Sequence, residues 1–204
     1  MNFKSYINII LVFLFIIISN SVFIIREGEQ AIVTQFGKPV GNAITQAGLH
    51  FKLPLVQTVS KFDKKILQWD GAANEIPTKD NKYIFIDTFA RWRISDALQF
   101  FKSAKNEMLA QSRLDDVIDG AVRDEISNRY MSEIIRSSDR DMETYESEIG
   151  NNNVDEDILR TGARSKIIES ILVNVSDKLS ELKLGIEVVD VQIKRVAYNL
   201  QVQE

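Results

Sequence analysis

The chain has 204 residues, a formal net charge of −4 and no cysteine. The lack of cysteine excludes disulfide bonds, thiolate metal sites and a cysteine nucleophile. An acidic chain without a basic stripe also argues against nucleic-acid binding, which relies on clustered Lys and Arg. The residues after position 25 suffice for one large domain or two small ones.

The first element is an apolar segment from Tyr6 to Ile25, preceded by a short flank of residues 1–5. Its twenty residues include no charge, and as a helix they would be about 30 Å long, the hydrocarbon thickness of a bilayer. A soluble core helix is rarely apolar on every side, so we predict an uncleaved transmembrane anchor with the ends Tyr6 and Ile25. A signal peptide is the alternative, but no small-residue cleavage site follows the segment. Flanking charges leave the orientation open, and the short N-terminal flank favours a cytoplasmic N-terminus.

Residues 26–95 predict a β-rich subdomain. The runs QAIVTQFGKPV, AGLHFKLPL and TVSKFDKKILQWD have strand-like character, and Gly or Pro interrupts the first two. The run NEIPTKDNKYIFIDTFARWRI predicts a hairpin with its turn at residues 79–81. Its second arm has apolar residues on both faces, which favours a sheet covered on both sides, at least in part. One face carries Ile84, Ile86, Ala90, Trp92 and Ile94, and the other carries Tyr83, Phe85 and Phe89.

Residues 96–198 predict a helical subdomain closed by a strand. Ser95 is a good N-cap for a first helix, with Asp96 suited to its positive end. A second helix has amphipathic spacing through Leu114, Val117, Ile118, Ala121, Val122 and Ile126. The stretch from Glu133 to Asp157 contains nine acidic residues and only two arginines, which indicates an irregular surface excursion.

A third helix is predicted from Ile158 to about Lys183. Its apolar stripe could face a partner helix, as in a coiled coil, or cover the domain's own sheet; it consists of Ile168, Ile171, Val175, Leu179 and Leu182. Gly185 then interrupts the chain before a β-branched strand, IEVVDVQIKRV, and residues 199–204 predict the start of another helix. The fold class is therefore α+β on a single N-terminal anchor.

The sequence contains no recognisable catalytic, metal-binding or phosphate-binding motif. The single histidine, His50, excludes sites that need two imidazoles, and no G-x-S-x-G elbow supports a Ser-His-Asp triad. No glycine-rich phosphate loop occurs. The run DRDMETYESEIG places Thr144 and Gly150 where a calcium loop needs Gly and Glu. We expect no catalytic residue, no metal site and no cofactor.

Four stretches in this order resemble the SPFH (band 7) family, which includes stomatin, prohibitin, flotillin and the HflK and HflC proteins. They are REGEQAIVTQFGKPV, AGLHFKLPLVQTVSKFDKKILQWD, YIFIDTFARWRISDALQFF and LGIEVVDVQIKRV. The resemblance is strongest to the HflC branch and covers the chain from the anchor to about Val196.

The resemblance implies a regulatory scaffold rather than an enzyme. Members of this branch are single-pass proteins of the bacterial inner membrane, with the SPFH domain on the periplasmic side. They assemble with an HflK-like paralogue around the FtsH AAA+ protease and control its access to membrane substrates. The GLHFKLP segment lies near the membrane in the family, so Phe51 and Leu53 are expected to touch lipid headgroups, unless they are ordinary inward-facing strand residues.

The sequence departs from the family at three points. Ala47 stands where a Pro is usual, Gln201 follows Leu200 where a Pro is usual, and the long charged C-terminal helix is lacking after Glu204. We therefore expect a chain truncated after the SPFH domain, which could cap or poison rings instead of building them. Two other functions stay open: a stomatin-like scaffold of membrane microdomains without a protease partner, and a hydrolase with a Ser-Lys arrangement.

Overall fold

The structure is a computed structural model that describes residues 3–135 and 163–198. The chain forms two compact units, and each unit combines separate stretches of the sequence. Unit 1 comprises residues 1–66, 93–106 and 183–187, and unit 2 comprises residues 67–92, 107–182 and 188–204. The predicted acidic excursion beyond residue 135, the first residues of the predicted third helix and the predicted terminal helix lie outside the described residues.

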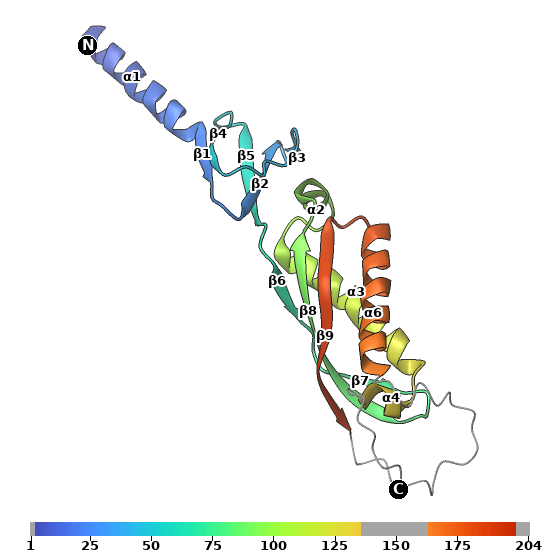
Figure 1. The fold of residues 1–204 in the computed structure, drawn as a ribbon. Helices are drawn as coiled ribbons and strands as arrows, with labels where there is room; N and C mark the ends of the chain where they lie inside the picture. Colours follow the sequence, from blue (N-terminus) through green and yellow to red (C-terminus); the bar gives the residue numbers. More distant parts are fainter. Residues whose placement is uncertain (1–2, 136–162, 199–204) are drawn as a thin grey trace, which may run out of the picture. The chain divides into compact units, whose positions relative to one another are not determined.

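Unit 1 contains two small antiparallel sheets (Figure 1). Strands β1 (Val22–Ile25) and β4 (Gly48–Phe51) form a two-stranded ribbon. Strand β2 (Glu29–Gln35) lies between the short β3 (Lys38–Pro39) and β5 (Gln57–Asp63). Apart from β1, which lies in the predicted apolar segment, these strands fall largely within the three strand-like runs of the sequence, so the predicted β-rich character is confirmed.

Helix α1 (Phe3–Asn20) ends before the predicted end of the apolar segment at Ile25. Asn20 and Ser21 donate side-chain hydrogen bonds to the carbonyl oxygens of Ile16 and Ile17, each at 2.9 Å. The following β-branched residues pair with β4 instead of continuing the helix, because that pairing buries Ile25. The predicted helical end is therefore wrong. Over residues 3–135 and 163–198, no helix combines the length and apolar character that crossing a membrane requires.

Helix α2 (Ala97–Ser103) completes the core of unit 1. Its Phe100 packs edge-on against Phe62 of β5, with ring centroids 5.2 Å apart. Asp96, not the predicted Ser95, caps the helix by accepting hydrogen bonds from the backbone N–H groups of Leu98 and Gln99. The helix begins at Ala97, so Asp96, whose backbone is extended, is the residue whose side chain reaches the free N–H groups of the first turn.

Unit 2 is built on a sheet in which β8 (Tyr83–Ile94) is central. Strands β6 (Leu67–Asp70) and β7 (Asn74–Pro77) pair with it in antiparallel register, and β9 (Ile186–Tyr198) also pairs with it. The predicted hairpin around residues 79–81 is confirmed. Every second residue of β8 from Ile84 to Ile94 is buried, whereas Tyr83 is exposed and Phe85 and Phe89 are half-buried. Only one face of this strand is thus fully covered.

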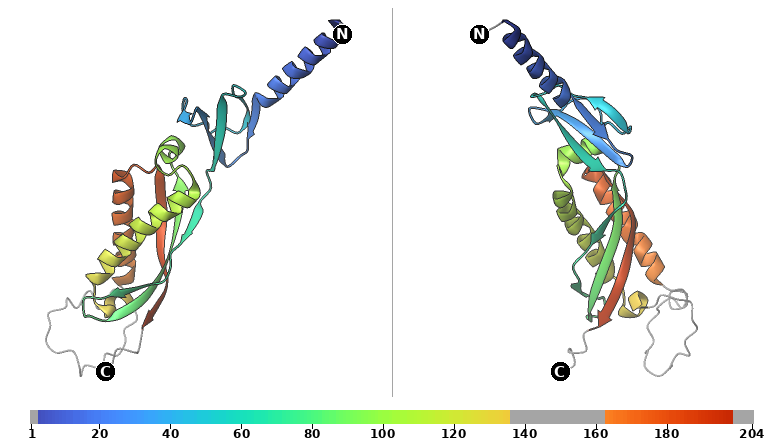
Figure 2. Two further views of the ribbon diagram at one scale, coloured as in Figure 1. Left: turned by 180° about the vertical axis from the view of Figure 1, so that it is seen from behind. Right: turned by 90° about the vertical axis from the view of Figure 1, so that its left-hand side faces the viewer.

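Within its described residues, unit 2 also contains the helices α3 (Glu107–Ser127), α4 (Met131–Ile135) and α6 (Ala163–Glu181). Helices α3 and α6 pack against each other on one side of the sheet (Figures 1 and 2). All six apolar residues predicted for the second helix are buried on α3. The α+β class is confirmed.

Candidate functional site

The first candidate site is an exposed apolar surface at one end of unit 1. In the β1–β4 ribbon, Val22 pairs with Phe51 and Ile24 pairs with Leu49, so these four apolar side chains share one face. Ile24, Leu49 and Phe51 are all largely exposed. The opposite face places Phe23 beside His50, with ring centroids 5.7 Å apart. The ribbon therefore turns an apolar face away from the core of its own unit.

Two turns extend this surface with unusually placed side chains. Phe36, between β2 and β3, has a φ of 50° and is 84% exposed. Leu55, between β4 and β5, has a φ of 67° and is 97% exposed. A left-handed conformation is uncommon for any residue other than glycine and is unfavourable for bulky side chains. Both turns thus present a bulky apolar group to the surroundings at a conformational cost.

Strand pairing brings these turns to the same end of unit 1. Gln35 pairs with Gln57, so the turn after β2 lies beside the turn before β5. The Lys52 N–H donates to the carbonyl of Ser21 at 2.7 Å, which joins the end of β4 to the end of α1. We call the exposed group formed by Phe36, Phe51, Leu53 and Leu55 the apolar tip.

The predicted lipid-contacting residues both belong to the apolar tip. Phe51 is 73% exposed and Leu53 is 58% exposed, so the inward-facing alternative does not hold. The sequence pattern does not single out Phe36 and Leu55, because hydropathy does not reveal a left-handed backbone conformation. A Gly directly after Phe36 and a Pro directly before Leu55 are the signals that could have marked both turns.

The predicted partner-facing stripe on α6 lies mainly inside unit 2. Ile171, Val175 and Leu179 are buried, Ile168 is half-buried, and Leu182 is exposed beyond the end of the helix. The helix packs on α3 and α4, so the buried stripe residues serve the unit's own core and are not available to a partner. The buried part of the stripe therefore lies inside unit 2, on a helix that packs with α3 on one side of the sheet.

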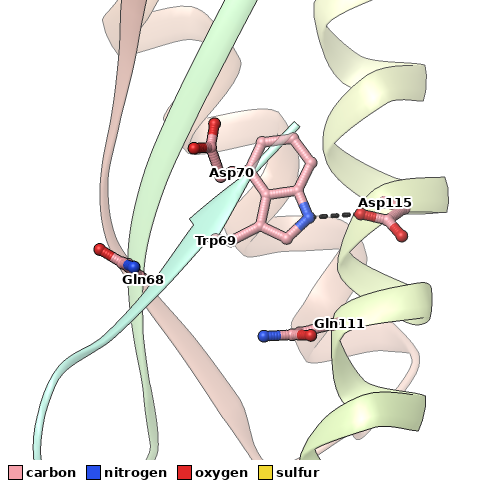
Figure 3. Close-up of a pocket in the computed structure, with 5 residues that line it drawn as sticks. All are labelled: Gln68, Trp69, Asp70, Gln111 and Asp115. Atoms are coloured by element: carbon pink, nitrogen blue, oxygen red, sulfur yellow. Dashed lines mark hydrogen bonds between the residues drawn. The ribbon is translucent and has the colours of Figure 1, made fainter. Parts of the chain in front are cut away.

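A polar recess between β6 and α3 is the second candidate site (Figure 3). It has a volume of about 320 Å³ and is lined by Gln68, Trp69, Asp70, Gln111 and Asp115. The buried indole of Trp69 donates through Nε1 to Asp115 Oδ1 at 2.5 Å (Figure 3). The lining offers carboxylates and amides but no hydroxyl, imidazole or amine. It therefore provides no hydroxyl or thiol nucleophile beside an imidazole or amine base.

Asp119 and His50 are two further ionisable groups in the described part of the chain. Burial raises the pKa of Asp119 on α3, and a hydrogen bond from Asn74 opposes this effect. His50 Nε2 lies 2.9 Å from the carbonyl oxygen of Gln46. Among the residues that the structure describes, no three His, Cys, Asp or Glu side chains are placed to hold a metal ion.

Comparison with known proteins identifies related chains. The model of the SPFH domain / Band 7 family matches residues 23–204. The chain is 35% identical over 182 residues to "Protein HflC" of Borreliella burgdorferi and 33% identical over 192 residues to "Protein HflC" of Treponema pallidum. It is 29% identical over 226 residues to "Modulator of FtsH protease HflC" of Escherichia coli K12.

These matches take in most of this chain but only part of each relative. They cover 87, 89 and 98% of the chain, and 56, 57 and 66% of the three relatives. The chain thus spans a little over half to about two thirds of the length of these relatives.

Proposed function

The chain belongs to the SPFH domain / Band 7 family, and we propose that it is an HflC-like regulatory subunit of a membrane-bound protease, without enzymatic activity of its own. The observation that carries this proposal is the similarity, over almost the whole chain, to proteins named HflC, one of which is described as a modulator of FtsH protease. In this role the chain would limit the access of an FtsH-type AAA+ protease to its membrane substrates.

Membrane attachment through the N-terminal segment is part of the proposal. The segment from Tyr6 to Ile25 has no charged side chain. On α1, apolar residues are exposed around the helix; they include Ile10, Leu11, Val12, Leu14, Phe15, Ile16 and Ile18. A helix with exposed apolar side chains on all sides is stabilised by lipid rather than by water. We propose a single-pass anchor in the bacterial inner membrane, with a cytoplasmic N-terminus and the SPFH domain in the periplasm.

The absence of cysteine makes this topology directly testable. The exposed Met108 of unit 2 can be replaced by Cys, which gives a chain with a single thiol. A membrane-impermeant maleimide added to intact spheroplasts should label that thiol. Labelling only after the membrane is permeabilised would place unit 2 on the cytoplasmic side and contradict the proposed topology.

The proposed partners are an HflK-like paralogue, an FtsH-type protease and the bilayer. The description of one relative as a modulator of FtsH protease supports the protease. The resemblance to the HflC branch implies the HflK-like paralogue, and the apolar tip supports contact of Phe51 and Leu53 with lipid headgroups. A tagged chain should be isolated from native membranes in mild detergent, with an untagged strain as control. We expect mass spectrometry to find the HflK-like protein and the protease, and electron microscopy to find large particles.

The same isolation distinguishes the second function, a stomatin-like scaffold of membrane microdomains without a protease partner. The apolar tip favours this alternative as much as the first, because both functions need a domain that touches lipid. If the chain is recovered with lipid alone, while the protease is present in the same membranes, the protease-directed role is wrong and the scaffold function replaces it.

A further inference from the structure

Acidic residues are almost absent from the part of the sequence that builds the apolar tip. The chain contains 29 Asp and Glu, yet none lies between Gln30 and Phe62, and only Glu27 and Glu29 precede this range. The same range holds three lysines, Lys38, Lys52 and Lys61. In a protein with a net negative charge, this segregation gives the surface around the tip a positive character.

Glu29 lies at the end of its strand that is away from the tip. Glu29 pairs with Asp63 at one end of the β2–β5 ladder, and Gln35 pairs with Gln57 at the other end, next to the tip. The six intervening steps along β2 correspond to about 20 Å at the usual rise of a strand. Glu29 also lies 3.7 Å from Lys61, which offsets the charge of that lysine.

Two lysines remain at the tip end. Lys38 follows the Phe36 turn directly and pairs in register with Gln35. Lys52 lies between the tip residues Phe51 and Leu53, and its backbone N–H binds the end of α1. The charge difference extends to the whole unit: unit 1 has 11 Lys and Arg against 5 Asp and Glu, whereas unit 2 has 14 against 24.

We propose that the apolar tip docks on the bilayer surface and gathers anionic phospholipids through Lys38 and Lys52. The inference rests on the proposed membrane attachment of α1 and names the class of lipid that the attached domain prefers. Apolar side chains flanked by lysines bind anionic membrane surfaces. Burial of the apolar side chains in the membrane and attraction of the lysines to anionic headgroups both contribute to the binding free energy. Lipid contact also provides a favourable environment for Phe36 and Leu55, which unit 1 leaves exposed in strained turns.

The test measures which lipid lies next to the tip. The full chain, carrying Leu55→Cys as its only cysteine and a fluorophore on that thiol, is reconstituted into vesicles of equal parts phosphatidylcholine and phosphatidylglycerol. In one sample the phosphatidylcholine carries an acyl-chain nitroxide quencher, and in the other sample the phosphatidylglycerol carries it. Both samples have the same composition, so any difference in quenching reports local enrichment and not overall binding. A chain labelled at Met108→Cys in unit 2 is the matched control.

We expect the anionic quencher to act about twofold more strongly than the zwitterionic one at position 55. The Lys38→Gln/Lys52→Gln variant, or high salt with the unsubstituted lysines, should make the two quenchers equal. Equal quenching without these changes, or an anionic preference that survives both, would overturn the headgroup selectivity.

Quenching by neither lipid would show that the tip binds something other than the bilayer, such as a protein partner, and would also overturn the inference. The protease-directed role fails separately, in the isolation from native membranes. The salt titration needs no charge substitution, so a misfolded lysine variant does not block the test.

Discussion

Arg91 on β8 and Asp190 on β9 form a bidentate ion pair between the two longest described strands. Arg91 Nε lies 2.9 Å from Asp190 Oδ1 and 3.0 Å from Oδ2, and Nη2 also donates to Oδ2. The pair stands beside an irregularity in β9, where the buried positions shift from Ile186 and Val188 to Val191 and Ile193. The ion pair therefore lies where the alternation of buried positions in β9 changes.

This pair predicts a pH-dependent stability. Hydrogen bonding from Arg91 lowers the pKa of Asp190 below its ordinary value. The stabilisation is therefore present above the unfolded carboxyl pKa of about 3.9 and is lost as the pH falls through the lower folded value. Asp190→Asn should lower the melting temperature near neutral pH, and its effect should shrink as the pH falls below the unfolded carboxyl pKa.

Circular dichroism melts in detergent at several pH values measure this difference. Glu187→Gln is the matched control, because Glu187 pairs with Arg93 while both side chains are about half exposed. It should change the melting temperature less than Asp190→Asn does. A loss in the Asp190 variant that is the same at acid and neutral pH would contradict the assignment.

The start of α2 predicts different effects for two adjacent residues. Asp96→Ala removes the side-chain acceptor of two backbone N–H groups and should lower the free energy of unfolding by about 1 kcal/mol. Asp96→Asn should retain most of that stability. Ser95→Ala should have little effect, because Ser95 contributes its backbone N–H and not its side chain to this corner. Chemical denaturation measures the free energy of unfolding of the three variants. A larger loss of stability for Ser95→Ala than for Asp96→Ala would show that Ser95 is the cap.

Gly185 occupies a position where the backbone leaves no room for a side chain. Its φ is 70°, its carbonyl accepts from Ser95 and Asp96, and an added Cβ would lie 2.6 Å from the Phe100 nitrogen. Gly185→Ala should therefore cost about 3 kcal/mol or more, since backbone strain and a steric clash add. Gly41→Ala is the control with a similar φ but no neighbour within 4 Å, and it should cost about 1 kcal/mol. Equal losses in denaturation experiments would show that strain alone acts at both positions.

The sequence predicts the elements of this fold better than their ends. The burial of every second residue of β8 can be predicted from the sequence between Ile84 and Ile94. This is so because the alternation is a property of the strand's own residues and needs no knowledge of its neighbours. The end of α1 is not visible, because Val22–Ile25 leave the helix to pair with Gly48–Phe51, more than twenty positions along the chain. Asp96 and Ser95 are both favourable caps by residue type, and the start of α2 at Ala97 makes Asp96 the cap.

The candidate site is predictable to a similar extent. Phe51 and Leu53 stand out as apolar residues around a short strand, and the structure exposes both. Phe36 and Leu55 join them only through the pairing of β2 with β5, which a linear pattern does not specify. For the α6 stripe, the sequence correctly predicts a helix with one apolar side. Helical spacing does not say whether that side meets a partner, the sheet or a neighbouring helix such as α3.

Two valines on α6 separate core packing from partner binding. Val175 is fully buried and Val173 is 53% exposed, two residues away on the same helix. Val175→Asp should lower the free energy of unfolding by about 3 kcal/mol or more, because an unpaired carboxylate enters an apolar core. Val173→Asp should stay within about 0.5 kcal/mol of the unsubstituted chain. If Val175→Asp left the melt of the isolated chain unchanged and weakened only its assembly, the stripe would face a partner after all.

The recess of Figure 3 predicts a graded series at Asp115. Trp69 is buried, and its indole N–H has Asp115 as its acceptor. Asp115→Ala removes that acceptor and should cost about 1–3 kcal/mol, the usual penalty for a buried donor without a partner. Asp115→Asn keeps a carbonyl oxygen at the same place and should cost less.

Asp116→Ala is the control for that series, since the neighbouring Asp116 is exposed and should tolerate the change. Nuclear magnetic resonance provides a second measurement, because the chain has only two tryptophans and therefore two indole N–H signals. Asp115→Ala should shift the Trp69 signal strongly and the Trp92 signal little. A shift of both signals, or of neither, would mean that the hydrogen bond does not hold Trp69 in place.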